Sequence, residues 1–197
     1  MLKIVLGTQN PHKIHEMNLI AKPFNIEFVM TQGDFNPEET GDTFEQNAYI
    51  KAEAAYKLGG GELFLADDSG LCVDFLDGAP GIKSARYADT TEHRIEKLLE
   101  TMKDAKNRNA HFECHLVLLD KEGGVLHKTK GVCRGKIAFE KKGEGGFGYD
   151  PVFILDKLNK TMAELSEDEK NLHSHRGKAL VDMLIWIKYK YGTSLSI

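Results

Sequence analysis

The sequence predicts an α/β fold built on a mixed sheet with a second lobe. Two apolar runs, 2–6 and 26–30, are each followed along the chain by a segment with the start signals of a helix. Three later runs, at 112–119, 125–130 and 132–139, have the composition of consecutive strands with no helix between them. Such strands are typical of an antiparallel or mixed part of a sheet, which favours a second lobe.

The first strand, Leu2–Leu6, leads into a polar turn and a helix start. Asn10 suits the N-cap position and Pro11 the first helical position, so we expect a helix from there towards Ala21. The unpaired N–H groups of such a helix start can bind an anion, and Lys13 would lie one turn in. An ordinary capped helix is the alternative, because neither a Walker loop nor a GxGxxG fingerprint is present.

A second helix start follows the strand Ile26–Met30. Asp42, with Glu45 three residues later, has the pattern of a capping box, and the glycines at 59–61 predict the end of this helix. Glu38 and Glu39 therefore lie in the loop before the helix. A solvated acidic loop is their simplest interpretation.

The most informative stretch is 63–74. Leu63–Ala66 indicates a short buried strand that ends on the polar run Asp67-Asp68-Ser69-Gly70. Strands of α/β sheets carry ligand sites at this end, and two adjacent carboxylates need a cation or donors nearby. Mg²⁺ prefers such oxygen ligands. A capping turn with both acids in water is the alternative.

The remaining elements are predicted from turn and capping signals. A turn at 78–81 precedes a helix from Thr91, and Ser166 with Glu169 has the pattern of a second capping box. The residues that we expect on the buried faces of the two later helices are Ile95, Leu98, Leu99 and Met102, and Leu180, Met183, Leu184 and Ile187.

The segment 143–151 contains four glycines around Phe147. Glycines allow the backbone to approach a ligand closely, and an aromatic ring can stack on a nucleobase. A loop whose aromatic residues fill the core is an equally good interpretation.

Composition limits the class of protein. The 197 residues carry a formal net charge of −4, which disfavours a general nucleic-acid binder, and no run is long enough for a membrane span. The three cysteines show no CxxC spacing, and no signal peptide is evident, so a reducing cytoplasmic setting is expected. His111 and His115 would lie about 13 Å apart along one strand, too far to share a metal ion.

Several motifs occur in one order along the chain. They are Thr8-x-Asn10-x-x-Lys13, Glu38-Glu39-Thr40-Gly41-x-Thr43-Phe44, Ala66-Asp67-Asp68-Ser69-Gly70-Leu71, Gly78-Ala79-Pro80-Gly81-Ile82-x-Ser84-Ala85-Arg86-Tyr87, Gly145-Gly146-Phe147-Gly148-Tyr149-Asp150-Pro151 and Ser174-His175-Arg176-Gly177. Together they resemble the non-canonical purine NTP pyrophosphatase family, the inosine or xanthosine triphosphate pyrophosphatases also called Ham1-like. The resemblance runs from the first strand to the last helix.

This resemblance implies an elongated α/β domain over residues 1–197 with two lobes and the active site in the cleft between them. It implies a Mg²⁺-dependent cytoplasmic homodimer that hydrolyses ITP, dITP and XTP to the monophosphate and pyrophosphate. No nucleic acid and no membrane are expected as partners. The alternative from another class is a purine-nucleotide-binding or sensing module without hydrolysis, since no nucleophile stands out in the sequence.

The resemblance also implies roles for individual residues. Asp68 would be the catalytic base and, with Glu38, a metal ligand, while Glu39 and Asp67 are possible further ligands. The residues expected to bind substrate are Thr8, Gln9, Asn10, Pro11, His12, Lys13, Ser69, Phe147, Gly148, Tyr149, Asp150, Lys170, His175 and Arg176. The chain departs from the family pattern at Gln46, where many relatives have Glu, and at Gln9, where a small residue is common.

Overall fold

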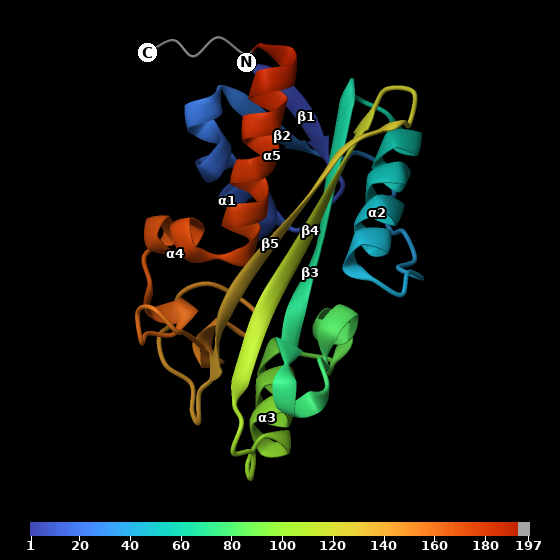
Figure 1. Ribbon diagram of the computed structural model, residues 1–197. Helices are drawn as coiled ribbons and strands as arrows, with labels where there is room; N and C mark the ends of the chain where they lie inside the picture. The colour runs from blue at the N-terminus through green and yellow to red at the C-terminus, as the bar shows by residue number, and fades with distance from the viewer. Residues whose placement is uncertain (193–197) are drawn as a thin grey trace. The chain divides into compact units, whose positions relative to one another are not determined.

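In the computed structural model, residues 1–192 are described, and they form a six-stranded mixed sheet with helices (Figure 1). The strand order is β2-β1-β3-β4-β5-β6, with β1 parallel to β2 and β3 and with β5 antiparallel to β6. The predicted α/β class with a mixed sheet is confirmed. The elements are β1 Leu2–Leu6, α1 Pro11–Ala21, β2 Ile26–Met30, α2 Phe44–Leu58, β3 Leu63–Val73, α3 Thr91–Thr101, β4 Asn109–Asp120, β5 Val125–Ile137, β6 Phe153–Leu155, α4 Glu167–His173 and α5 His175–Tyr191.

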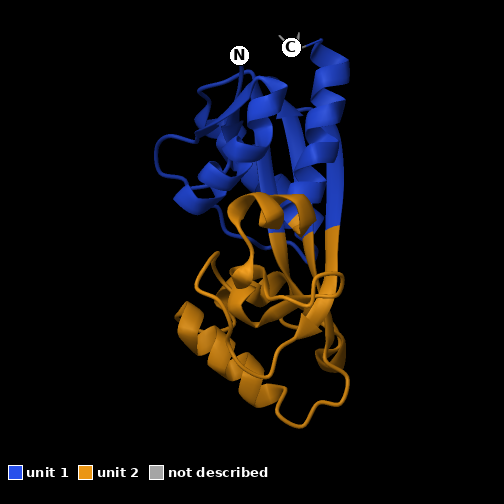
Figure 2. Ribbon diagram, turned by 90° about the vertical axis from the view of Figure 1, so that its left-hand side faces the viewer, with its two compact units in different colours: residues 1–68, 114–131, 176–197 blue, residues 69–113, 132–175 orange. Residues whose placement is uncertain are grey.

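The chain divides into two compact units, which Figure 2 shows in blue and orange. Unit 1 contains Met1–Asp68, Cys114–Gly131 and the chain from Arg176 onward. Unit 2 contains Ser69–Glu113 and Val132–His175. Each unit has a hydrophobic core of its own.

In unit 1, α1 and α5 lie on one side of the strands and α2 lies on the other (Figure 1). The predicted face of α5 is confirmed, because Leu180, Met183, Leu184 and Ile187 are all fully buried. On the other side the small residues Ala48, Ala52 and Ala55 of α2 join a cluster with Phe64 and Ala66 of β3. Small side chains let a helix backbone approach a sheet closely, which brings the polar residues of α2 near β3.

The hydrophobic core of unit 2 contains residues of α3 and several aromatic side chains. Ile95, Leu98 and Met102 are buried in one cluster with Leu71, Phe112 and Phe153, and Leu99 packs partly buried against it, so the predicted face of α3 is confirmed. The ring of Phe112 also meets that of Phe153 edge to face, with 4.7 Å between the ring centroids.

The helix starts follow the expected capping chemistry, with one correction. Asn10 accepts from the N–H of His12 and Pro11 opens α1, and Ser166 and Glu169 form a capping box at α4, as predicted. The cap of α2 was expected at Asp42 with Glu45. It is Thr43 instead, whose hydroxyl accepts from the N–H of Gln46.

Two strand predictions were wrong, and one strand was missed. The short strand Leu63–Ala66 does not end at the carboxylates, since β3 continues to Val73. The runs 125–130 and 132–139 form the single strand β5, which passes through Gly131. The short strand β6 was missed, because three residues carry too little pattern to predict. Within the described residues, no helix is both long and apolar enough to cross a membrane.

Candidate functional site

Asp67 and Asp68 are adjacent in sequence but face opposite sides of β3. Successive side chains of a strand alternate between its two faces, and both carboxylates lie inside β3 rather than at its end. Asp67 bonds to residues of α1 and α5, and Asp68 bonds to a residue of α2. The two acids therefore belong to two separate ionic clusters of unit 1.

Asp67 is part of a buried chain of alternating charges. Lys13 Nζ donates to Asp67 Oδ1 at 2.8 Å, and the Nε and Nη2 atoms of Arg176 each lie 3.4 Å from Oδ2. Arg176 Nη1 donates to Glu16 Oε2 at 2.7 Å. Lys13 is the most exposed member, with 18% of its side chain accessible against 1% for Asp67. We define Glu16, Arg176, Asp67 and Lys13 as the inner cluster.

The inner cluster holds its charges firmly. Burial alone would raise the pKa of Asp67, but Lys13, Arg176 and Lys51 outweigh it and hold that pKa well below its ordinary value. Burial would likewise lower the pKa of Arg176, but Glu16 and Asp67 raise it instead. Arg176 is 2% exposed, so a direct contact with a ligand would first require these ion pairs to open.

Asp68 lies in the second cluster, with Lys51 and Glu39. Lys51 Nζ is 2.7 Å from Asp68 Oδ1 and 2.8 Å from Glu39 Oε1. The other oxygen of Asp68, Oδ2, is buried and has no hydrogen-bond partner. A buried carboxylate oxygen without a partner is unfavourable unless a water, cation or ligand completes it. We define Lys51, Asp68 and Glu39 as the outer cluster.

The two partners in the outer cluster have different electrostatics. Burial is the main reason that the pKa of Asp68 is raised above its ordinary value, and the nearby carboxylates of Glu39 and Asp67 add to the shift. Burial acts against the charged form of Lys51, but Asp68, Asp67 and Glu39 together raise its pKa. Lys51 therefore keeps its proton, and Asp68 is a better proton acceptor than an ordinary aspartate.

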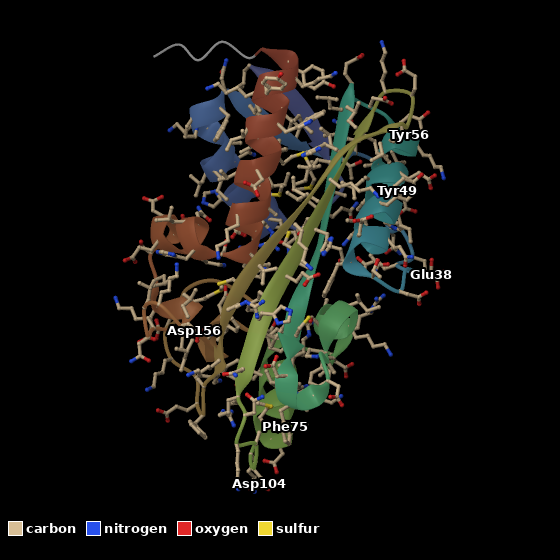
Figure 3. All side chains as sticks on the ribbon, viewed as in Figure 1. Glu38, Tyr49, Tyr56, Phe75, Asp104 and Asp156 are labelled. Carbon is tan, nitrogen blue, oxygen red and sulfur yellow. The ribbon has the colours of Figure 1, made fainter. Side chains whose placement is uncertain are left out.

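Glu38 and Glu39 differ in their placement. Glu38 is exposed on the segment that precedes α2 (Figure 3). Glu39 is half-buried and reaches Lys51, and through it the outer cluster. The resemblance gave Glu38 as the metal ligand and Glu39 as a possible further one. Of the two, Glu39 is the one that is linked to Asp68, through Lys51.

The first loop is ordered by its own side chains. Thr8 Oγ1 accepts from the N–H of Asn10 at 3.1 Å, and Asn10 Oδ1 accepts from the N–H of His12 at 2.9 Å. Gln9 Nε2 donates to the carbonyl of Gly33 at 3.3 Å, which holds this side chain against the segment after β2. The N–H of His12 is engaged and Pro11 has none, so the Lys13 side chain is the main source of positive charge at the start of α1.

The glycine-rich segment of unit 2 is organised by Asp150. Its Oδ2 accepts from the N–H of Phe147 and from Lys170 Nζ, each at 2.8 Å. Lys170 Nζ also lies 4.4 Å from the centroid of the Phe147 ring. Gly146 has φ +72°, and a Cβ there would collide with the Asp150 carboxylate, so the approach requires glycine. Phe147 itself is half-buried.

The other predicted residues of unit 2 have different surroundings. Tyr149 is a core residue whose hydroxyl donates to the carbonyl of Ser84 at 2.9 Å, and burial raises its pKa. The ring of His175 stacks on Phe112, with 4.7 Å between the ring centroids. Gly148 adopts φ +62°, and Ser69 is half-buried within β3. For Tyr149 the interpretation as a core aromatic is the one that its side chain fits.

Sequence reasoning missed Lys51 and Glu16. Both lie among apolar residues of a helix, Lys51 next to Ala52 and Glu16 next to Met17, and both are buried. A charged residue on the buried stripe of a helix is unusual and requires a partner. That pattern is visible in the sequence and could have identified both.

The chain is similar to known proteins over most of its length, and residues 4–186 match the family model described as "Ham1 family". A dITP/XTP pyrophosphatase from Treponema denticola is 44% identical, covering 95% of this chain and 99% of that protein. One from Synechocystis sp. is 42% identical, covering 91% and 92%.

Two solved structures are similar as well. A HAM1 protein from Coxiella burnetii has a TM-score of 0.85 and 40% identity, covering 96% of this chain and all (100%) of that one. A nucleoside-triphosphatase / dITP/XTP pyrophosphatase from Mycobacterium abscessus has a TM-score of 0.72 and 36% identity, covering 93% and 99%.

Proposed function

This chain belongs to the Ham1 family, and we propose that it hydrolyses the non-canonical purine nucleoside triphosphates ITP, dITP and XTP to monophosphate and pyrophosphate. It is a hydrolase of nucleotide metabolism. In this proposal the whole chain forms one catalytic domain. The observation that carries the proposal is the outer cluster, in which Asp68 has a raised pKa and one oxygen without a partner.

Mg²⁺ is the proposed cofactor, and the outer cluster suits it. Asp68 Oδ2 is an oxygen ligand without a partner. Lys51 pairs with both Asp68 and Glu39, so the Glu39 carboxylate lies nearby as a second oxygen ligand. No three His, Cys, Asp or Glu side chains of residues 1–192 gather into a complete metal site. A cation held by Asp68 and Glu39 would therefore take its other ligands from water and phosphate, as Mg²⁺ commonly does. When bound, Mg²⁺ would neutralise charge on the phosphates.

Asp68 acts as the general base in this proposal. A general base works best when its pKa lies closer to the working pH than that of an exposed carboxylate, and burial moves Asp68 in that direction. Lys51 fixes the carboxylate through Oδ1, and Oδ2 has two lone pairs, so it can face the cation with one and accept the proton of the attacking water with the other. No covalent nucleophile is needed for this reaction.

Lys13 holds the triphosphate in this proposal, together with the loop from Thr8 to His12. Its ammonium group is a point charge on a flexible stem, which suits a phosphate group. Asp67 and, through it, Arg176 and Glu16 fix the ammonium on the partly exposed side of the inner cluster. Arg176 and Asp67 are thus assigned as positioning residues for Lys13.

The purine is assigned to unit 2. Phe147 offers a half-buried aromatic ring. Asp150 accepts from the N–H of Phe147 and from Lys170, whose ammonium group lies over that ring. Stacking on a ring of this kind is worth about 1–3 kcal/mol per base in single-strand binders. Ser69, Gly148 and His175 complete the proposed substrate contacts, and Tyr149 supports them from the core.

The test is product analysis with ITP, dITP and XTP, each with Mg²⁺ and with excess chelator. We expect equal amounts of monophosphate and pyrophosphate, released only with the metal. Release of diphosphate and phosphate would contradict the proposed bond cleavage. Binding of ITP without any product would favour the nucleotide-sensing module instead. Asp68→Asn is the matched control, because it keeps the shape of the side chain and removes the base.

Two further expectations belong to this proposal. The protein is proposed to act as a homodimer, which light scattering would detect as a mass of twice the 22.0 kDa chain. It is also proposed to act in the cytoplasm, where ITP and its relatives arise in the nucleotide pool. Cell fractionation tests the second expectation.

A further inference from the structure

The first turn of α2 holds the acidic loop through two neighbouring side chains. Asn47 Oδ1 accepts from the N–H of Gly41 at 2.8 Å, and Gln46 Oε1 accepts from the N–H of Asp42 at 2.7 Å. A neutral amide performs the second task as well as a carboxylate would. Gln46 therefore supplies the acceptor for the N–H of Asp42 without a charge.

Asn47 makes the more buried of the two contacts. It is fully buried, and a Cβ on Gly41 would lie 2.7 Å from Asn47 Oδ1 and 2.6 Å from the Cβ of Gln46. Only a glycine lets the loop approach the helix this closely. The loop is therefore seated directly on the Asn47 amide.

The same helix holds the loop at a second point. Lys51, one turn after Asn47 on the same face of α2, bonds Glu39 at 2.8 Å and Asp68 at 2.7 Å. Glu39 is two residues from Gly41, so a shift of Gly41 away from Asn47 would move Glu39 relative to Lys51. The position of Glu39 thus depends on a buried amide that touches neither carboxylate of the outer cluster.

The choice of an amide fits its surroundings. An aspartate at 47 would also accept from Gly41, but it would add a third negative charge near Glu39 and Asp68. Asn47 supplies the acceptor without that charge. Its Nδ2 is buried and has no hydrogen-bond partner among the described residues, so the contact that Asn47 makes is the one to Gly41.

We propose that Asn47 is a positioning residue that fixes Gly41 and thereby holds Glu39 in place to share a divalent cation with Asp68. This inference rests on the proposed function only for the cation; the seating of the loop is independent of it. Residues that orient metal ligands from behind typically change metal affinity or activity about 10–100-fold when they are mutated.

Hydrogen exchange tests the seating of the loop without any reaction. In Asn47→Ala the amide of Gly41 loses its acceptor, so peptides covering 39–43 should exchange faster than in the wild type. Asn47→Asp keeps the acceptor and should keep the protection. Unchanged exchange in Asn47→Ala would overturn the proposal at its first step.

A double-mutant cycle tests the link to Glu39. We expect Asn47→Ala and Glu39→Gln each to raise the Mg²⁺ concentration for half-maximal ITP hydrolysis about tenfold. If Asn47 acts through Glu39, the double variant should be no worse than Glu39→Gln alone. Multiplied effects of about a hundredfold would mean independent roles and would overturn the proposal.

Asn18→Ala is the matched control. Asn18 also fixes a backbone with its amide, bonding the N–H and carbonyl of Phe28 at 2.8 and 2.9 Å, but it does so away from the outer cluster. It should lower the melting temperature without changing the Mg²⁺ requirement. A wild type with no hydrolysis would refute the proposed function, whereas the exchange experiment would still decide whether Asn47 seats the loop.

Discussion

Lys51 binds one oxygen of Asp68 and leaves the other without a partner, so this carboxylate is fixed in orientation yet still available. Asp67, the preceding residue, has both oxygens engaged by Lys13 and Arg176. The same side chain at neighbouring positions is thus fully bonded at one and half bonded at the other. The difference arises from the alternation of side chains along β3.

The two aspartates should therefore respond differently to the same substitution. Asp68→Asn is expected to lower kcat by at least about 100-fold, because the base is lost. It should cost less stability than the same change at Asp67, because burial already disfavours the charged form of Asp68, as its raised pKa shows, and Lys51 keeps Glu39 as a partner. Asp67→Asn removes the charge that holds Arg176 and Lys13, and breaking a buried pair of this kind destabilises by about 3–5 kcal/mol. Urea denaturation and steady-state kinetics on both variants measure this. Wild-type turnover in Asp68→Asn at saturating Mg²⁺ would exclude it as the base.

The lowered pKa of Asp67 also predicts how the stability of the fold depends on pH. Its pKa in the fold is lowered from the ordinary value of 3.8, so the folded state binds fewer protons there than the unfolded chain. The stabilisation is therefore fully present above the unfolded pKa and is lost as the pH falls towards the folded one. We expect the melting temperature to fall on acidification below about pH 4, and to fall less steeply in Asp67→Asn. Parallel curves for the two proteins would contradict this.

Lys13 is predicted to recognise the outer phosphates. Lys13→Ala should weaken ITP far more than inosine monophosphate, because the monophosphate lacks the groups that the ammonium contacts. Titrating both ligands against the inactive Asp68→Asn protein measures the difference without turnover. Lys3→Ala, which removes an exposed lysine paired with Glu27, is the control for net charge. An equal loss for both ligands would place Lys13 elsewhere.

The secondary structure could be predicted where the signals are local. Asn10 and Pro11 are adjacent residues that together predict the start of α1, and the helix begins at Pro11. The end of β3 was predicted wrongly, because Asp67 and Asp68 have the composition of a turn. They remain in the strand since partners far away in sequence pair with them, such as Arg176, 109 residues later. Nothing in a local window indicates that partner.

The candidate site was predictable only in part for the same reason. Motif resemblance gave Asp68 and Lys13 as candidate residues, but the contacts of Lys51 and Glu16 depend on which helix face packs against which strand. Arg176 was expected to bind substrate, and its guanidinium nitrogens bond Glu16 and Asp67. A sequence gives the type of each side chain, while its partners come from the packing of elements distant along the chain.

Arg176 accordingly has a predicted effect on stability. Arg176→Ala leaves Glu16 and Asp67 without their shared partner, and we expect a loss of about 3–5 kcal/mol in the free energy of unfolding. Arg176→Lys keeps the positive charge and should retain part of this free energy of unfolding. If Arg176 also reads the purine, Arg176→Lys should lower kcat/KM for ITP more than for ATP. An unchanged ITP-to-ATP ratio would leave Arg176 with the positioning role alone.

Phe147 and Asp150 are predicted to act as one unit on the purine. Phe147→Ala should lower kcat/KM for ITP and ATP by the same factor, because stacking does not distinguish one purine from another. Asp150→Ala should have a similar effect, because Asp150 accepts from the N–H of Phe147 and from Lys170. Phe139→Ala is the control, since that ring is 78% exposed and stacks only with Arg108 among the described contacts of unit 2. A selective loss for ITP in Phe147→Ala would show that the ring contributes to base discrimination and would contradict its assignment as a general stacking surface.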